Sequence, residues 1–250
     1  MTAGRKNGRD DGAGSGRTTH RIPRLSEVVV EALGESALLV RFGNRIDSEL
    51  NHLVHALDAS VRSHPAPWLR DCVPAYASLA LFYDPDGFDA ARDPFEEVSR
   101  WVRERMGAMS STRPTASGRL VEIPVRYGGA AGPDLTDVAT HAGLTERDVI
   151  ARHCQVEYRV ALLGFAPGFP YLLGLDPALA MPRLSQPRTQ VAAGSVGIGG
   201  AQTGIYPRSG PGGWRLIGRT DVVLFDAARE APSLLQPGDR VRFLPIEAPG

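Results

Sequence analysis

Lysine is almost absent from this chain of 250 residues, and its absence excludes several kinds of chemistry. Lys6 is the only lysine, and it lies in a glycine-rich opening segment. A Walker A phosphate loop, a pyridoxal Schiff base and a biotin attachment site each require a lysine. The folded part of the chain can therefore carry none of them, and an anionic ligand has to be bound by arginine, backbone amides or a metal ion.

Other features are also scarce. The two cysteines, Cys72 and Cys154, have no metal-ligand spacing, and we expect them to be reduced and buried. The formal net charge is zero, which argues against a nucleic-acid partner. No run approaches the ~18 to 20 apolar residues that cross a bilayer, and the N-terminus lacks a secretory h-region. We therefore expect a cytoplasmic protein without membrane contact.

The chain divides into four stretches by composition and periodicity. Residues 1–24 are poor in apolar side chains and are expected to form a disordered tail. Residues 25–108 predict an α+β domain of order ββαββα, with helices on one face of an antiparallel sheet. Residues 109–118 break every pattern and are expected to be a linker. Residues 119–250 then form a second, mainly β domain.

Capping residues mark the two helices expected in the first domain. Asp47 or Ser48 begins the first helix, and Asp93, Pro94 and Glu96 predict a capping box at the second. The expected strands are 28–30, 38–42, 71–76 and 78–83.

The second domain is expected to begin with a strand and two short helices, which start at Asp134 and Thr145. Short strands separated by glycine and proline turns follow, and many such strands are typical of a closed barrel or a sandwich. The expected strands are 120–127, 158–165, 190–192, 195–198, 204–206, 214–217, 222–225 and 241–244.

Glycines are dense from Gly164 to Phe225, and aromatic residues are interleaved with them. The segment begins with GFAPGFPY, in which two prolines fix φ and two glycines allow sharp turns. We expect a rigid surface loop that forms either a substrate wall or a partner-docking face. Its candidate residues are Phe165, Pro167, Gly168, Phe169 and Tyr171.

Four other patterns are interpreted as structural. His52 and His55 lie three residues apart on a helix, but no third ligand completes a metal site, so we predict no metal centre. Ser195 lacks the first glycine of a nucleophile elbow. His153 and Cys154 are adjacent and face different directions on a helix. The segment GSVGIGG opens no helix that could bind a pyrophosphate.

One long stretch resembles a known family. Residues 164–220 read GFAPGFPYLLGLDPALAMPRLSQPRTQVAAGSVGIGGAQTGIYPRSGPGGWRLIGRT and resemble the carboxyltransferase subdomain C and D family. The resemblance extends through EYRVALLGF, VEIPVRYGG and DCVPAYASLALFYDP to about residues 26–246. It implies a small α+β domain followed by a cyclophilin-like β-barrel domain.

Family members include the B-type subunit of 5-oxoprolinase, the kinase inhibitor KipI and one part of urea carboxylase. The resemblance implies a subunit that acts with a C-type partner, and with a lactam-utilisation hydrolase subunit, to open 5-oxoproline to glutamate. ATP, with Mg²⁺, would be the cofactor, and no biotin would be attached to this chain. Two alternatives stay open: a KipI-like histidine-kinase inhibitor without catalytic activity, and the carboxyltransferase component of a biotin-dependent urea carboxylase.

The chemistry requires groups that bind anions and a group that can move a proton. Arg188 and Arg219 each precede a threonine, and arginine binds carboxylates and phosphates through a bidentate fork. Glu157 is the best candidate for a general base, with Arg159 beside it as the second catalytic candidate. The remaining candidate substrate or nucleotide contacts are Gln202, Thr203, Tyr206, Trp214 and Thr220.

Overall fold

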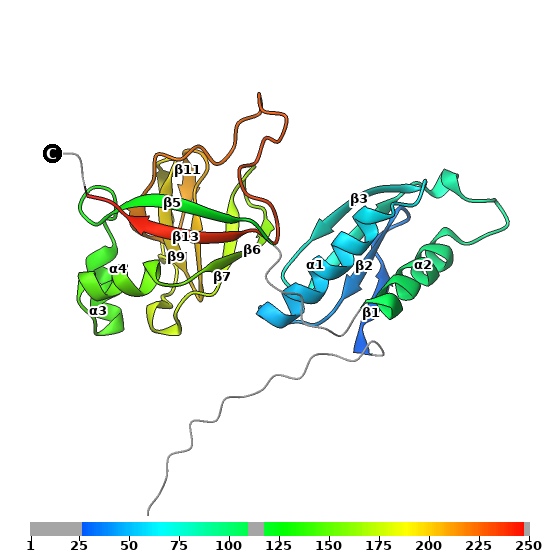
Figure 1. The fold of residues 1–250 in the computed structure, drawn as a ribbon, viewed down its shortest axis with the longest axis horizontal. Helices are drawn as coiled ribbons and strands as arrows, with labels where there is room; N and C mark the ends of the chain where they lie inside the picture. The colour runs from blue at the N-terminus through cyan, green and yellow to red at the C-terminus, as the bar shows by residue number, and fades with distance from the viewer. Residues whose placement is uncertain (1–26, 110–117, 248–250) are drawn as a thin grey trace, which may run out of the picture.

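The computed structural model describes residues 27–109 and 118–247. Figure 1 shows two lobes, a sheet with helices α1 and α2 and a barrel with helices α3 and α4. Each lobe has its own hydrophobic core. The expected tail, and the expected linker apart from its two end residues, lie outside the described residues.

The first lobe is an antiparallel sheet of order β1-β2-β4-β3. Alternate residues of β2 and β4 are buried, which places one face of the sheet in the same core as both helices. Its elements are β1 (Val29–Ala32), β2 (Ala37–Arg41), α1 (Ser48–Ser63), β3 (Leu69–Pro74), β4 (Ser78–Tyr83), the 3-10 turn η2 (Pro85–Gly87) and α2 (Pro94–Ala108).

The helix starts follow their capping residues. Asp47 accepts hydrogen bonds from the amides of Glu49 and Leu50 at the start of α1. At α2 the side chain of Asp93 accepts from the amide of Phe95, one residue before the position that a capping box uses. Both helices therefore have a side-chain cap. At α2 the cap is made to the amide of Phe95, two residues after Asp93, and not to the amide of Glu96, three residues after it, as the capping box predicts.

The second lobe is a closed barrel of order β10-β7-β6-β13-β5-β12-β9. Strand β13 pairs with β5 in parallel, and the other pairs are antiparallel. Strands β8 and β11 form a separate two-stranded sheet. The elements are β5 (Leu120–Tyr127), α3 (Leu135–Ala142), α4 (Glu146–Cys154), β6 (Tyr158–Leu163), β7 (Pro170–Leu173), η3 (Pro177–Leu179), β8 (Arg188–Val191), β9 (Ser195–Gly199), β10 (Gln202–Ile205), β11 (Gly210–Gly212), β12 (Arg215–Arg219) and β13 (Arg240–Pro245).

The mixed α+β architecture with a barrel is confirmed, but two local predictions are wrong. Residues 222–225 form no strand, because the Thr220 hydroxyl accepts from the Val222 amide in a turn and only Phe225 forms an isolated bridge. The expected loop GFAPGFPY ends in a strand, since β7 begins at Pro170.

A few polar and aromatic contacts join the two lobes. The buried Asn51 amide of α1 donates to the carbonyls of Ala75, Tyr76 and, across the junction, Ala161 of β6. The Gln202 side chain donates to the Tyr76 hydroxyl over 2.6 Å. The segment between β3 and β4 is thereby held against the barrel.

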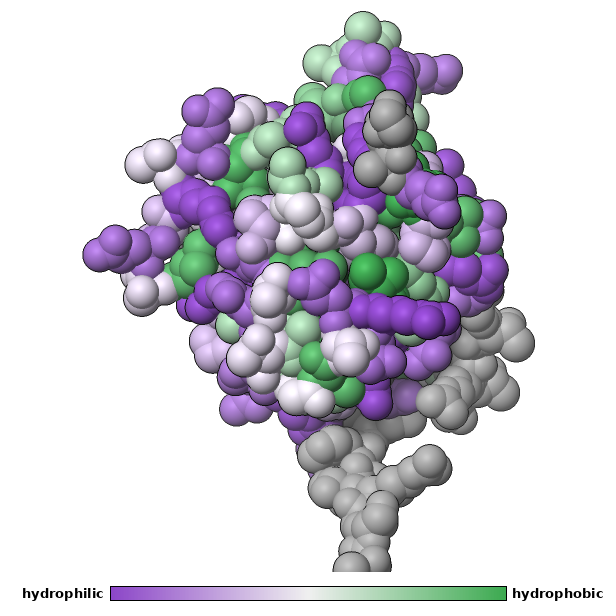
Figure 2. Space-filling view, turned by 90° about the vertical axis from the view of Figure 1, so that its left-hand side faces the viewer, coloured by the Kyte–Doolittle hydropathy of each residue, from purple (hydrophilic) through white to green (hydrophobic). Residues whose placement is uncertain are grey.

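The described surface of the barrel is mixed in character. On the face shown in Figure 2, hydrophobic patches are small and hydrophilic side chains separate them. No helix in the described part of the chain is long and apolar enough to cross a bilayer.

Candidate functional site

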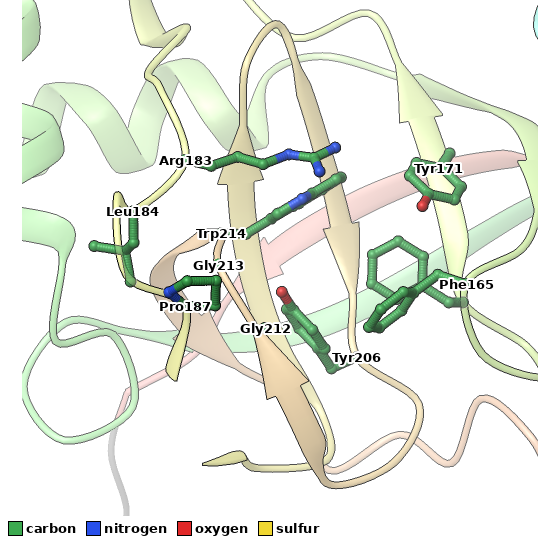
Figure 3. A pocket seen from close by; sticks show the side chains of 10 residues that line it. Phe165, Tyr171, Arg183, Leu184, Pro187, Tyr206, Gly212, Gly213 and Trp214 are labelled. Carbon is green, nitrogen blue, oxygen red and sulfur yellow. The ribbon is translucent and has the colours of Figure 1, made fainter. Parts of the chain in front are cut away.

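An aromatic pocket of about 140 Å³ lies on the barrel (Figure 3). Its walls come from the turn before β7, from β7 itself, from the segment after η3 and from both sides of β11. The residues that line it are Phe165, Phe169, Tyr171, Arg183, Leu184, Pro187, Tyr206, Gly212, Gly213 and Trp214. Five of the predicted site residues, all of them aromatic, meet here.

The aromatic rings pack edge to face. Phe169 is at the centre, with ring centroids 5.3 Å from Tyr206, 5.5 Å from Trp214 and 5.0 Å from Tyr171. Edge-to-face pairs at such distances are favourable beyond their area burial. Phe169 is buried, so it supports the wall from behind rather than forming an exposed loop as expected.

Glycines make room for this aromatic cluster. A Cβ atom on Gly199 would lie 2.6 Å from the Trp214 indole, and one on Gly212 would lie 2.4 Å from the Tyr206 hydroxyl. Such distances are shorter than any van der Waals contact, so a side chain at either position would displace the ring. The density of glycine in this segment therefore reflects the close approach of large rings to the backbone.

The lip of the pocket carries backbone strain. Phe165 has φ of 66°, and it is the one residue other than glycine with a positive φ among the described residues. It is 64% exposed. A bulky residue in this conformation costs of order 1–3 kcal/mol, and such strain concentrates at ligand-binding sites. The expected sharp turn is present, with positive φ at Phe165 and Gly168 rather than at Gly164.

Arg183 is the cation of this pocket. Its guanidinium carbon lies 5.7 Å from the centroid of the Trp214 ring, and Figure 3 shows the side chain lying along that ring. Arg183 is exposed, and no carboxylate among residues 27–109 and 118–247 forms an ion pair with it. None of the described residues that line the pocket is acidic.

Two tyrosine hydroxyls near the pocket stay uncharged. Burial raises the pKa of Tyr206, whose hydroxyl hydrogen-bonds to the backbone of Trp214. Burial also raises the pKa of Tyr76 to about 12, although the hydrogen bond from Gln202 opposes the shift. The Tyr76 ring packs edge to face on Tyr171 at 5.9 Å, so the first lobe supports one wall of the pocket.

The predicted anion-binding arginines lie elsewhere. Arg188 is paired with the buried Asp134 carboxylate at 2.7 Å, and Arg219 donates to the carbonyl of Ala193. Asp134 also accepts from the Leu216 amide, so this carboxylate joins the start of α3 to both β8 and β12. Neither guanidinium is saturated, because the buried Nη1 of Arg188 has no hydrogen-bond partner among the described residues and Arg219 is bonded through Nε alone. Their binding of an anion stays a prediction.

The predicted catalytic pair also lies outside the pocket. Glu157 forms ion pairs with Arg240 and Arg242, and hydrogen bonds from both hold its pKa below the ordinary value. A carboxylate held in this way is a poor general base. Arg159 lies opposite Arg240 on the neighbouring strand, and burial lowers its pKa.

Three polar candidates form hydrogen bonds within the fold, and their contact with a ligand stays a prediction. Thr203 is fully buried, donates to the Gly197 carbonyl and lies 3.0 Å from the His153 ring. The Thr220 hydroxyl accepts a hydrogen bond from the Val222 amide, and the Gln202 side chain donates one to the Tyr76 hydroxyl. None of the three lines the pocket.

Two of the residues that the sequence favoured as structural, His153 and Ser195, are buried in the second lobe. His153 stacks on Phe243 at 4.6 Å, and burial lowers its pKa to about 3. Ser195 is buried in β9. Within the described ranges, no group of three potential ligands could hold a metal ion.

Both cysteines have free thiols, as expected, but only one is fully buried. Cys72 lies in the core of the first lobe. Cys154 is half-buried at the end of α4, where its thiol donates to the Tyr127 hydroxyl.

Sequence reasoning missed Arg183. The residue stands in the segment MPRLSQP, which carries no motif, and what distinguishes it is its position over the Trp214 ring in the lining of the pocket. The sequence does not show which arginines form ion pairs with carboxylates, because the partners are brought together only by the fold.

Comparison with known proteins shows the family of this chain. The family model described as carboxyltransferase domain, subdomain C and D, matches residues 28–235. The chain belongs to this family. It is 46% identical over 225 residues to the B-type subunit of 5-oxoprolinase from Bacillus subtilis, covering 87% of this chain and 92% of that protein. It is 33% identical over 253 residues to urea amidolyase of Saccharomyces cerevisiae, covering 90% of this chain but 14% of that protein.

A solved structure shares both the fold and the sequence. The protein named TTHA0988 has a TM-score of 0.72 and 43% identity, over 85% of this chain and 40% of that chain. This chain therefore spans less than half of that longer protein.

Proposed function

We propose that this chain is the B-type subunit of a 5-oxoprolinase, which acts with a C-type partner subunit to convert 5-oxo-L-proline to L-glutamate. The similarity to the B-type subunit extends over 92% of the Bacillus subtilis protein, which supports a subunit of matching extent. The observation in the structure that carries the proposal is a small aromatic pocket with a guanidinium that no carboxylate of the described residues neutralises. Such a pocket suits a small organic anion.

The pocket alone lacks the groups that the reaction needs. An amide is a poor electrophile, and coupling to ATP hydrolysis makes the opening of the lactam favourable. The aromatic pocket is too small for a triphosphate, and Arg188 and Arg219, each bonded to another residue of the fold, do not line it. We assign the binding of ATP and Mg²⁺ to the complex with the partner, so the isolated chain is expected to be inactive.

Two other functions make different predictions. A KipI-like inhibitor would dock a histidine kinase and would need no small-molecule pocket. The urea amidolyase match covers only 14% of that protein, and the folded part of this chain has no lysine that could carry biotin. A carboxyltransferase role would therefore require biotin on another polypeptide.

The test is co-expression with a C-type partner, followed by an assay of glutamate release with a lactam-utilisation hydrolase subunit added. We expect release that depends on ATP, on 5-oxoproline and on the presence of both subunits. Reactions without ATP and reactions with either subunit alone are the controls. A stable complex that releases no glutamate contradicts the proposal, and inhibition of a histidine kinase by the same preparation would favour the KipI-like alternative.

A further inference from the structure

We propose that the aromatic pocket binds a five-membered lactam carboxylate, with Arg183 binding the carboxylate and the rings of Phe165, Tyr206 and Trp214 enclosing the lactam. This inference rests on the proposed function for the identity of the ligand. It adds a location and a residue that determines specificity, neither of which follows from the family.

The size of the pocket suits a ligand with one ring. The pocket has a volume of about 140 Å³. A protein cavity of roughly 150 Å³ lined by apolar side chains accommodates benzene. A five-membered ring with a short substituent fits this space, whereas a nucleoside does not. The backbone at Gly199 and Gly212 lies directly against the rings of Trp214 and Tyr206. The rings therefore cannot move closer to the backbone to enlarge the pocket.

Charge selects an anion. Among the described residues that line the pocket, Arg183 is the only one with a charged side chain. Its guanidinium lies over the face of Trp214, which leaves the N–H groups at its edge free to donate to two carboxylate oxygens. A carboxylate attached to a ring among the aromatic side chains would lie beside this guanidinium.

Polar groups can meet the lactam amide. A lactam presents one N–H donor and one C=O acceptor, and a neutral hydroxyl can both donate and accept. The Tyr206 hydroxyl is neutral at physiological pH, burial raises its pKa further, and Tyr171 presents a second hydroxyl in the same lining. Figure 3 shows Tyr171 and Phe165 on the opposite side of the pocket from Arg183. The ligand would therefore have its charged end at Arg183 and its amide toward the tyrosines.

The matched pair of ligands is 5-oxoproline and 2-pyrrolidinone, which is the same lactam without the carboxylate. The full chain would be titrated with each ligand, and the indole resonance of Trp214, identified with Trp214→Phe, would be followed by NMR. Arg183→Ala is expected to weaken 5-oxoproline binding about tenfold and to leave 2-pyrrolidinone binding within about twofold. Arg208→Ala removes an exposed arginine outside the pocket lining and is expected to change neither affinity.

The same variants would be compared in the assembled complex. Arg183→Ala is expected to raise KM for 5-oxoproline about tenfold and to leave KM for ATP unchanged. The inference would be overturned if Arg183→Ala weakened the binding of both lactams equally or left 5-oxoproline binding unchanged. It would also be overturned if inorganic phosphate displaced the ligand. Binding without turnover would contradict the proposed function alone, whereas turnover that ignores Arg183→Ala would contradict the pocket assignment alone.

Discussion

Two arginine-bearing regions of the barrel differ in one respect. At the strand face of β13, Arg240 and Arg242 share the Glu157 carboxylate. At the aromatic pocket, Arg183 has an indole beneath it and no carboxylate partner in the described part of the chain. The first region stabilises the fold locally, and the second leaves a charge available for a ligand.

The difference shows why residue type alone is a weak guide to a site. Glu157 and its neighbouring arginine look like catalytic groups in sequence, yet the Glu157 charge is satisfied within the fold. A better guide to a binding site is a charged group that has no oppositely charged partner and lies beside a cavity of suitable size. Four predictions test this contrast, from the largest expected effect to the smallest.

A side chain beneath the Trp214 ring should disturb the aromatic pocket and its binding of substrate. In Gly199→Ala the new Cβ would lie 2.6 Å from the Trp214 indole, so we expect the ring to shift, at a cost of about 1–3 kcal/mol in the free energy of unfolding. KM for 5-oxoproline should rise by about tenfold or more. Gly210→Ala has open space around the new atom and is the control for kinetics and thermal stability. Equal behaviour of the two variants would show that the ring position does not matter.

Loosening the junction should weaken the pocket indirectly. Asn51→Ala removes the donor to three carbonyls, including that of Tyr76, and should lower the free energy of unfolding by about 1–3 kcal/mol. Because Tyr76 supports Tyr171, KM for 5-oxoproline should also rise a few fold.

Ser99→Ala is the matched control for Asn51→Ala. It removes a buried hydroxyl that has no hydrogen-bond partner among the described residues, and it should cost little stability. If Ser99→Ala destabilised the chain as much as Asn51→Ala, the three bonds of the Asn51 amide would not account for the loss.

Acid should destabilise the junction through His55. Burial and, to a smaller extent, the Arg159 charge lower the pKa of His55 to about 4 from 6.5. Between these values the unfolded chain binds the proton more readily, so stability falls as the pH falls, by up to about 1.4 kcal/mol per pH unit. His55→Gln should reduce this slope in chemical unfolding measured from about pH 4 to 7. An unchanged slope would mean that the pKa of His55 is the same in the folded and the unfolded chain.

Removing the Glu157 charge should barely affect catalysis. In Glu157→Gln we expect kcat within about twofold of the wild type, because the carboxylate serves Arg240 and Arg242 rather than substrate. The pKa of Glu157 is lowered in the fold, so its contribution to stability is present above the unfolded pKa and is lost as the pH falls through the folded value. A drop in kcat of about a hundredfold would reverse the assignment of the two regions.

Local sequence signals predicted most of the fold. Asp47 and the Thr145–Asp148 capping box begin helices as expected, and alternating apolar residues mark the strands of the first lobe. The errors occurred where a turn replaced a strand, at Val222, or where a strand began inside a proline-rich loop, at Pro170.

The site was predicted in part. The aromatic residues could be singled out because they stand among glycines, which is a local feature of the sequence. The arginines could not be sorted, because their partners are distant: Arg188 pairs with Asp134, 54 residues away. The availability of Arg183 is a property of the folded chain alone.

A crystal structure of the chain, alone or in its complex, soaked with 5-oxoproline would test the central claim most directly. The account predicts ligand density between Phe165 and Trp214, with the carboxylate about 3 Å from the Arg183 guanidinium. Ligand bound beside Glu157 and Arg240, or at another surface with the aromatic pocket empty, would contradict it.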